Sequence, residues 1–220
     1  MQLHWQCEIP TVTSLSWRLH QMPQNIPAGS SGGPDDITAQ QLRDLLAGAP
    51  DERFMFAVTD FVNVLQNGEL PLQVREIIFG GRLIALQQKD GWIRPIAVGY
   101  TLRQLAAKCV NSFVIKKRSN ELQPMQVGAG ASGGVEAANY AVCRFAEHLP
   151  DDQEIVKLNF SNAFNSVRRD TILISVLDKM PELYRFVHAS LHCSTNLSYG
   201  VDITVFAEGS QQGDPLSSME

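Results

Sequence analysis

Basic side chains that could bind phosphate are concentrated in one short stretch of the sequence. Residues 75–118 hold nine of the 18 lysines and arginines against two acids, a local balance of +7, whereas the whole chain of 220 residues carries −5. Lysine and arginine bind nucleic acids by neutralising phosphates and releasing counterions. The stretch therefore predicts a basic surface on an otherwise acidic protein, although a solvated helix face would have the same composition.

Two histidines and a cysteine have a spacing that could suit a metal ion. His188 and His192 stand four residues apart, and Cys193 follows directly. A helix would place both imidazoles on one face, as a zinc site requires. Such short patterns recur by chance and no further ligand pair is evident, so zinc binding is not the favoured interpretation. Asp214 could also be a metal ligand, but its place in the sequence favours hydrogen bonds to backbone amides near a helix start.

Hydrophobic patterning predicts the elements that must hold these residues. Apolar residues recur at helical spacing in five segments, namely 37–46, 54–65, 102–122, 135–149 and 169–180. Residues 82–86 and 93–98 flank Asp90-Gly91 and should form an antiparallel hairpin, because Asp-Gly suits a tight turn. Residues 154–160 alternate as in a strand, and residues 197–206 indicate a second hairpin. We expect an α+β fold with an antiparallel sheet and packed helices.

The composition is typical of a globular protein. Hydrophobic residues make up 44% and charged residues 19%, and no run of eighteen apolar residues or leader-like start is present. We expect a soluble, intracellular protein with no membrane partner. The four cysteines lie far apart and lack the pairing of zinc sites or small disulfide frameworks, so they are expected to be reduced and mostly buried.

Three stretches resemble the reverse transcriptase domain of non-LTR retrotransposons. They run from Lys89 to Arg103, from Lys157 to Val167 and from Glu208 to Ser217, and they occur in the family's order. The resemblance covers residues 33–220 and implies the fingers and part of the palm of a right-hand polymerase. It divides the chain into an irregular N-terminal arm (1–32), a fingers-like region (33–153) and a partial palm (154–220) that ends after the second palm motif.

The first stretch, Lys89-Asp90-Gly91-Trp92-Ile93-Arg94-Pro95-Ile96, is similar to the family's fingers hairpin. The resemblance implies that Arg94 binds the phosphates of the incoming nucleotide and that Lys89 has a similar role. A guanidinium on a rigid strand supplies a planar set of donors with little entropy to lose. The alternative is that Arg94 is only an exposed strand residue.

The second stretch resembles the first palm motif, in which a strand ends at a metal-binding aspartate. Here that position holds Asn159. The family's reaction uses two Mg²⁺ ions held by carboxylates. A neutral amide binds Mg²⁺ weakly, so we predict that activity is reduced by at least ~100-fold. By the resemblance, the backbone carbonyl of Phe160 is still available to a metal ion.

The same resemblance assigns roles to the residues that follow. Phe164 would be the steric gate that excludes a 2′-hydroxyl, and Asn162 and Ala163 would offer backbone amides to the triphosphate. A core aromatic at a turn into a helix is the alternative for Phe164. The third stretch resembles the template-positioning loop of the second palm motif, where Gln212 and Gly213 pack beside the nascent base pair, and glycine permits a close backbone approach.

The resemblance implies an RNA-directed DNA polymerase domain. Its partners would be an RNA template, a DNA primer and a dNTP, with Mg²⁺ as the cofactor. We predict that this chain is inactive, because Asn159 replaces the aspartate and the sequence reaches Glu220 before the family's paired-aspartate turn. Two alternatives stay open, a non-catalytic nucleic-acid-binding or subunit-interaction module and a decayed retroelement product with unpaired sheet edges.

Overall fold

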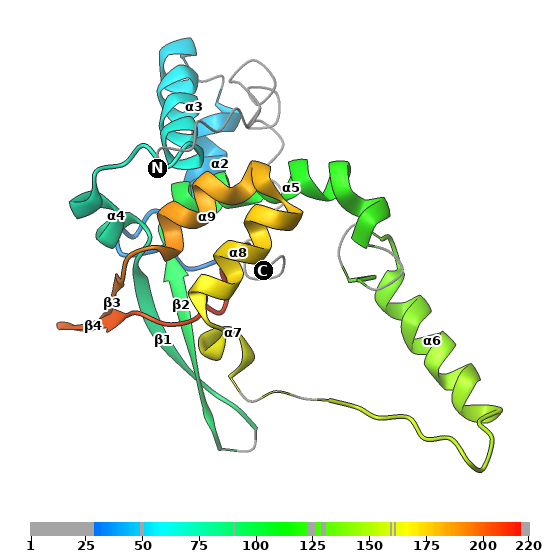
Figure 1. Cartoon of the computed structure of the whole chain (residues 1–220). Coiled ribbons are helices and arrows are strands. Elements are labelled where there is room, and N and C mark those ends of the chain that lie inside the picture. The colour runs from blue at the N-terminus through cyan, green and yellow to red at the C-terminus, as the bar shows by residue number, and fades with distance from the viewer. Residues whose placement is uncertain are drawn as a thin grey trace.

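The computed structural model describes residues 29–48, 51–89, 91–122, 126–128, 131–158, 160 and 162–216. Helices and a four-stranded sheet occur together in this part of the chain, which confirms the predicted α+β class. Figure 1 shows the helices gathered above the sheet, a long hairpin that reaches down from them, and one helix that extends away to the side.

Within the described residues, three helices precede the sheet. They are α2 (Ala39–Ala47), α3 (Glu52–Gln66) and α4 (Leu72–Ile78). Thr38 begins α2 with a reciprocal capping box, in which its hydroxyl accepts from the Gln41 amide and the Gln41 side chain accepts from the Thr38 amide. The two helices predicted here are confirmed. Helix α4 was not predicted, because its seven residues are fewer than the window of about 11–18 residues over which helical periodicity can be recognised.

The sheet is built from two hairpins. Strands β1 (Gly81–Gln87) and β2 (Ile93–Gly99) pair antiparallel, as do β3 (Thr195–Tyr199) and β4 (Asp202–Phe206), so both predicted hairpins are confirmed. The strand order is β2-β1-β3-β4, and β1 pairs with β3 in parallel over a short register. The sheet is therefore mixed, which corrects the expectation of an antiparallel sheet. The long helical connection between the two hairpins allows them to meet in the parallel sense.

One hydrophobic core lies among the helices. It involves α5 (Thr101–Leu122), α8 (Arg169–Lys179), the short 3₁₀ helix η2 (Pro181–Leu183) and α9 (Tyr184–Leu191), together with α2 and α3. The helices predicted at 102–122 and 169–180 are confirmed. Residues on both sides of the predicted domain boundary at 153/154 share this core, which includes Leu65, Leu105, Val176 and Phe186. The division into fingers and palm stays a prediction.

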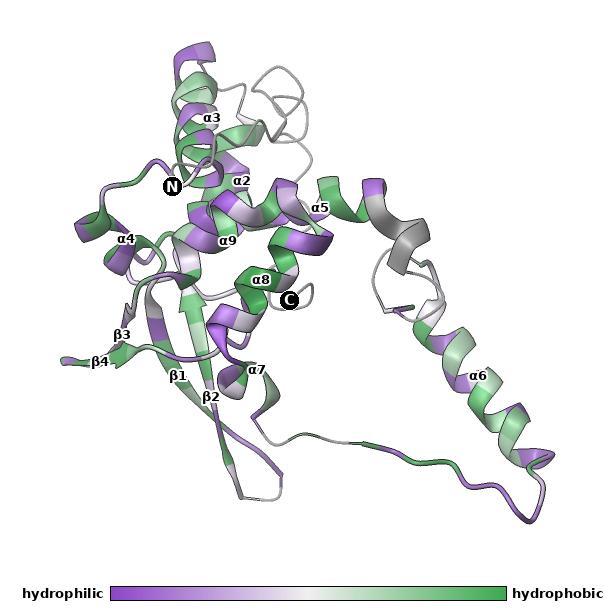
Figure 2. Ribbon diagram, in the orientation of Figure 1, coloured by the Kyte–Doolittle hydropathy of each residue, from purple (hydrophilic) through white to green (hydrophobic). Residues whose placement is uncertain are grey.

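Helix α6 (Gly134–Glu147) leads away from this core (Figure 1). Its position agrees with the helix predicted at 135–149, yet only Gly134 is buried. Hydrophobic residues alternate with polar ones along it in Figure 2 and remain exposed, among them Tyr140 and Phe145. The short helix α7 (Ala163–Ser166) then begins the next packed part of the chain.

The strand predicted at 154–160 is wrong for the residues that the structure describes. Residues 154–158 and 160 form neither helix nor strand, and their side chains are exposed. Figure 1 shows this segment as an extended trace between α6 and α7, away from the sheet. Strand propensity depends on a neighbouring strand and a surface to cover, and the described residues place neither beside this segment.

The N-terminal arm predicted at 1–32 is described only from Gly29 onward, where it is irregular, and residues 1–28 lie outside the described residues. Gly33 packs against the end of β2, since a Cβ there would come within 2.6 Å of the Gly99 carbonyl oxygen. Asp36 pairs with Arg82 of β1 at 2.7 Å. Across the described part of the chain, no helix combines the length and apolarity needed to cross a bilayer.

Candidate functional site

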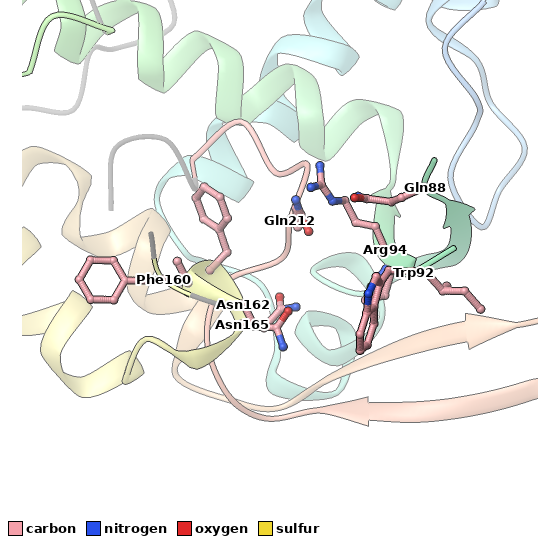
Figure 3. Close-up of a pocket in the computed structure, with 11 residues that line it drawn as sticks. Gln88, Trp92, Arg94, Phe160, Asn162, Asn165 and Gln212 are labelled. Carbon is pink, nitrogen blue, oxygen red and sulfur yellow. The ribbon is translucent and has the colours of Figure 1, made fainter. Parts of the chain in front are cut away.

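An open pocket of about 420 Å³ lies between the β1–β2 hairpin, α7 and the loop after β4. Three distant parts of the sequence line it. The lining residues are Gln88, Trp92, Ile93, Arg94, Pro95, Phe160, Asn162, Ala163, Phe164, Asn165 and Gln212. Figure 3 shows Gln88, Trp92 and Arg94 on one side and Asn162 and Asn165 on the other, with Gln212 above the two asparagines and beside Arg94 in this view.

The hairpin supplies the positive charge of this pocket. Arg94 lies on β2, directly opposite Leu86 of β1, and its side chain is exposed. With the Gln88 amide turned so that its oxygen faces the guanidinium, that oxygen accepts from Nε at 2.6 Å and from Nη2 at 3.0 Å. Gln88 thus binds the Nε and Nη2 edge of the guanidinium. This contact fixes the orientation of the group and leaves Nη1 to donate to an anion.

The wall opposite the hairpin begins with an unusual backbone. Asn162 has φ +51° and ψ +34°, the left-handed conformation, and directly precedes α7. Asparagine tolerates this conformation better than most residues do. Phe164 follows on α7, and its side chain is 42% exposed and lines the pocket. Phe164 is therefore not a core residue, which rules out the alternative interpretation of this aromatic.

The loop after β4, residues 207–216, closes the pocket between these two walls. The Ser210 amide donates to the carbonyl oxygen of Phe164 at 2.8 Å, which ties the loop to α7. A Cβ on Gly213 would meet Ile96 Cγ2 at 3.4 Å and the Ala97 carbonyl oxygen at 3.5 Å, so the loop also lies against β2. Gln212 lines the pocket, whereas Gly213 packs beside the hairpin without lining it.

A buried ion pair that was not predicted from the sequence holds this loop. Arg103 of α5 is 2% exposed and donates from both Nη atoms to Oδ2 of Asp214. Oδ1 of Asp214 accepts from the Leu216 amide at 3.0 Å, as predicted for this aspartate. A signal for Arg103 was present, because it shares a helix face with Ala106, Ala107 and Val110, all buried.

Two predicted site residues, Lys89 and Gly213, do not line the pocket. Lys89 lies exposed at the tip of the hairpin and does not line the pocket. Asn159, the position of the family's aspartate, lies outside the described residues. Arg94, Asn162, Ala163, Phe164, Gln212 and the flanking Phe160 all line the pocket.

The predicted basic surface is smaller than the sequence indicates. Arg103 is buried in its ion pair, and Arg75 donates to the carbonyl oxygens of Leu70 and Gly68. Lys108 is partly buried, and this burial together with nearby Arg43 lowers the pKa of its ammonium group. Several of the nine basic residues therefore support the fold, and the hairpin carries the exposed charge near the pocket.

His188 and His192 lie on one helix face, as the sequence predicted, but as a stacked pair. Their ring centroids are 4.4 Å apart with an interplanar angle of 17°. The residues that the structure describes contain no cluster of three His, Cys, Asp or Glu side chains suited to a metal ion. Of the three cysteines that the structure describes, Cys109 is buried, Cys193 is half-buried and Cys143 is exposed, so the expectation of mostly buried cysteines holds among them only for Cys109. Cys7 lies outside the described residues.

The described pocket lining does not fit a Mg²⁺ ion. Its polar groups are amides, backbone groups and the Arg94 guanidinium, and no carboxylate is among the lining residues. Mg²⁺ binds through carboxylates that offset its costly dehydration, and a nearby guanidinium repels it. Asp214, two residues after Gln212 in the sequence, is engaged by Arg103 and by the Leu216 amide.

Comparison with known proteins found no match, either among protein-family models or among curated proteins. The family resemblance therefore depends on the three motifs. Residues from all three stretches line the pocket.

Proposed function

We propose that this chain is a reverse-transcriptase-like module that binds nucleotide phosphates at the hairpin pocket and does not catalyse templated synthesis. One observation carries the proposal: residues of the fingers hairpin, the first palm motif and the second palm motif line a single pocket. Motifs that matched by chance would not be expected to meet in space. The resemblance supplies the ligand class, a dNTP beside an RNA template and a DNA primer.

The chemistry of the lining supports a nucleotide as ligand. Arg94 provides a fixed cation for phosphate, and Trp92, Phe160 and Phe164 provide aromatic surface near a sugar or a base. Base stacking on aromatic side chains contributes about 1–3 kcal/mol per base in single-stranded nucleic-acid complexes. Asn162, Asn165 and Gln212 add neutral donors and acceptors that could orient the ligand.

The absence of catalysis is proposed on the basis of charge. The family's reaction needs carboxylates at the metal ions, whereas Asn159 is neutral and the described lining holds no acid. We expect no templated dNTP incorporation by the purified chain on an RNA template with a DNA primer. Processive synthesis would overturn this part of the proposal.

Binding can be measured in a variant with a single tryptophan. Replacing Trp5 and Trp17 by phenylalanine leaves Trp92, which is 76% exposed and lines the pocket, as the only tryptophan. Titration with a dNTP in the presence of EDTA should change the emission of Trp92 in a saturable way. Arg94→Met should weaken the affinity about 10- to 100-fold, because a charge-assisted hydrogen bond contributes about 1.5–3 kcal/mol.

Arg53→Met is the matched control. It removes the same charge from α3, where Arg53 is exposed and pairs with Asp51, and it should leave the affinity unchanged. Equal loss in both variants would indicate a nonspecific charge effect and contradict the pocket as the site.

Binding of the primer–template is tested by fluorescence anisotropy of an RNA template annealed to a DNA primer across a salt series. The logarithm of the affinity should fall linearly with the logarithm of salt concentration, and Arg94→Met should reduce the slope by about one. No binding at low salt would favour a decayed product over a binding module.

A further inference from the structure

The loop after β4 contains a tight turn whose tip carries the pocket residue. The Asp214 amide donates to the Gln211 carbonyl oxygen at 3.0 Å, which closes a four-residue turn. Gln212 and Gly213 are its two central residues, and Gly213 has φ +103°. A positive φ at the third position is typical of a type II turn and favours glycine there. The turn therefore places Gln212 at the pocket, while the first and last residues of the turn, Gln211 and Asp214, lie toward the interior.

A single buried guanidinium contacts both ends of this turn. Arg103 donates to Oδ2 of Asp214, from Nη2 at 2.6 Å, and Nη2 also lies 3.4 Å from Oε1 of Gln211. The side chains of Arg103 and Asp214 are 2% and 10% exposed, and Gln211 is 7% exposed. Because the groups are shielded from water, displacing any one of them would leave a polar or charged atom buried without its partner.

The rest of the contacts around the turn make its position specific. Gln211 Nε2 donates to the Phe79 carbonyl oxygen at 2.8 Å, and Asn111 of α5 donates from its side chain to the Pro215 carbonyl oxygen. Gly99 leaves room for the guanidinium, since a Cβ at this position would lie 2.9 Å from Arg103 Nη2. Arg103 and Asn111 of α5, about two helical turns apart, thus hold the turn and the residue that follows it.

We infer that Arg103 and Asp214 are positioning residues of the pocket. Their ion pair fixes the position of Gln212 and Gly213 between the hairpin and α7. The inference rests on the proposed function, because the ligand class is taken from it. Neither residue lines the pocket. They act through the turn, and loss of the pair should allow Gln212 to leave the lining while the hydrophobic core stays intact.

The principal variant is Arg103→Met combined with Asp214→Leu. Replacing both members of a buried ion pair by apolar residues of similar size is often neutral for stability, whereas removing one member is strongly destabilising. The double variant should therefore fold and still unfold cooperatively in urea. Its affinity for a dNTP, measured by Trp92 emission, should fall about tenfold or more, because apolar contacts do not fix the direction of the turn as hydrogen bonds do.

A second measurement needs no ligand. Hydrogen exchange followed by mass spectrometry should show faster exchange in the peptide that contains the Ser210 and Asp214 amides, which bond Phe164 and Gln211. The β1–β2 amides should keep their protection. Arg103→Lys, which keeps the charge but loses the fork, should also accelerate exchange in this loop if it folds.

Glu182→Gln is the matched control. Glu182 is a buried acid of η2 that lies 3.7 Å from Lys117 and does not line the pocket. Its replacement should change neither the dNTP affinity nor exchange in the loop. Unchanged exchange in the loop of the double variant would overturn the inference, as would wild-type affinity with faster exchange. Absence of dNTP binding in the unmodified chain would instead overturn the proposed function, and the exchange result would still decide whether the pair holds the turn.

Discussion

Single residues decide how closely the loop after β4 can approach α7, and Gly209 illustrates this. It has φ +63°, and a Cβ there would come within 2.4 Å of the Phe164 carbonyl oxygen. Gly200 has φ +60° in the β3–β4 turn, with nothing within 4 Å of its Cβ position. The two glycines share a backbone conformation and differ in their neighbours.

Substitutions at these two glycines distinguish the cost of backbone strain from the cost of a steric clash. Gly200→Ala should cost only the left-handed conformation, about 1 kcal/mol in the free energy of unfolding. Gly209→Ala should cost more, about 2–4 kcal/mol, because the Phe164 backbone must also move. Urea denaturation of both variants measures the difference, and equal losses would contradict the close approach of the loop to α7.

The protonation of His188 should make the free energy of unfolding depend on pH. Burial, followed by the charges of His192 and Arg75, lowers the pKa of His188. A histidine in an unfolded chain has a pKa of about 6.5. The unfolded chain therefore binds this proton more readily than the folded chain does. The free energy of unfolding should fall as the pH falls below that value.

His188→Gln should make the free energy of unfolding less dependent on pH over this range. The variant removes the group whose protonation the folded state resists, and the neighbouring Tyr184 and His192 rings remain. Urea denaturation at about pH 7.5 and at about pH 5.5, on either side of the histidine range, provides the comparison. An unchanged slope of stability against pH would show that His188 does not contribute.

At the scale of elements, local capping explains why the short helix α2 has a definite start. The reciprocal bonds between Thr38 and Gln41 satisfy donors that a helix start leaves free. Thr38→Ala should lower the free energy of unfolding by about 1 kcal/mol. Thr38→Ser keeps a hydroxyl and should retain most of the stability in the same urea experiment. Equal losses would assign the effect to the threonine methyl group.

At the scale of the whole molecule, stability comes from the helical core and not from α6. Leu105 is completely buried in that core, whereas Tyr140 and Phe145 of α6 are 68% and 55% exposed. Leu105→Ala should lower the free energy of unfolding by about 2–5 kcal/mol. Tyr140→Ser and Phe145→Ser should change it by less than about 0.5 kcal/mol, as expected for exposed positions. A large loss in the α6 variants would show that this helix is packed in solution.

The sequence by itself determined the elements whose signals are local. The hairpin at residues 81–99 follows from the two segments that flank Asp90-Gly91, and α2 follows from the apolar residues at helical spacing in 37–46. The pocket residues Arg94, Phe164 and Gln212 were also predicted, but from motif resemblance and not from contacts. Local patterns suffice in these cases because neighbours along the chain supply the deciding interactions.

Only the tertiary structure decided the features that depend on distant partners. The strand pattern at 154–160 did not become a strand, because no neighbouring strand pairs with its described residues. The parallel pairing of β1 with β3 joins segments more than 100 residues apart. Arg103 was included in the predicted basic surface, yet it is buried in an ion pair with Asp214. The apolar helix face could indicate that Arg103 is buried, but its partner Asp214 lies 111 residues away in the sequence. The ion pair that holds the pocket loop could therefore be found only in three dimensions.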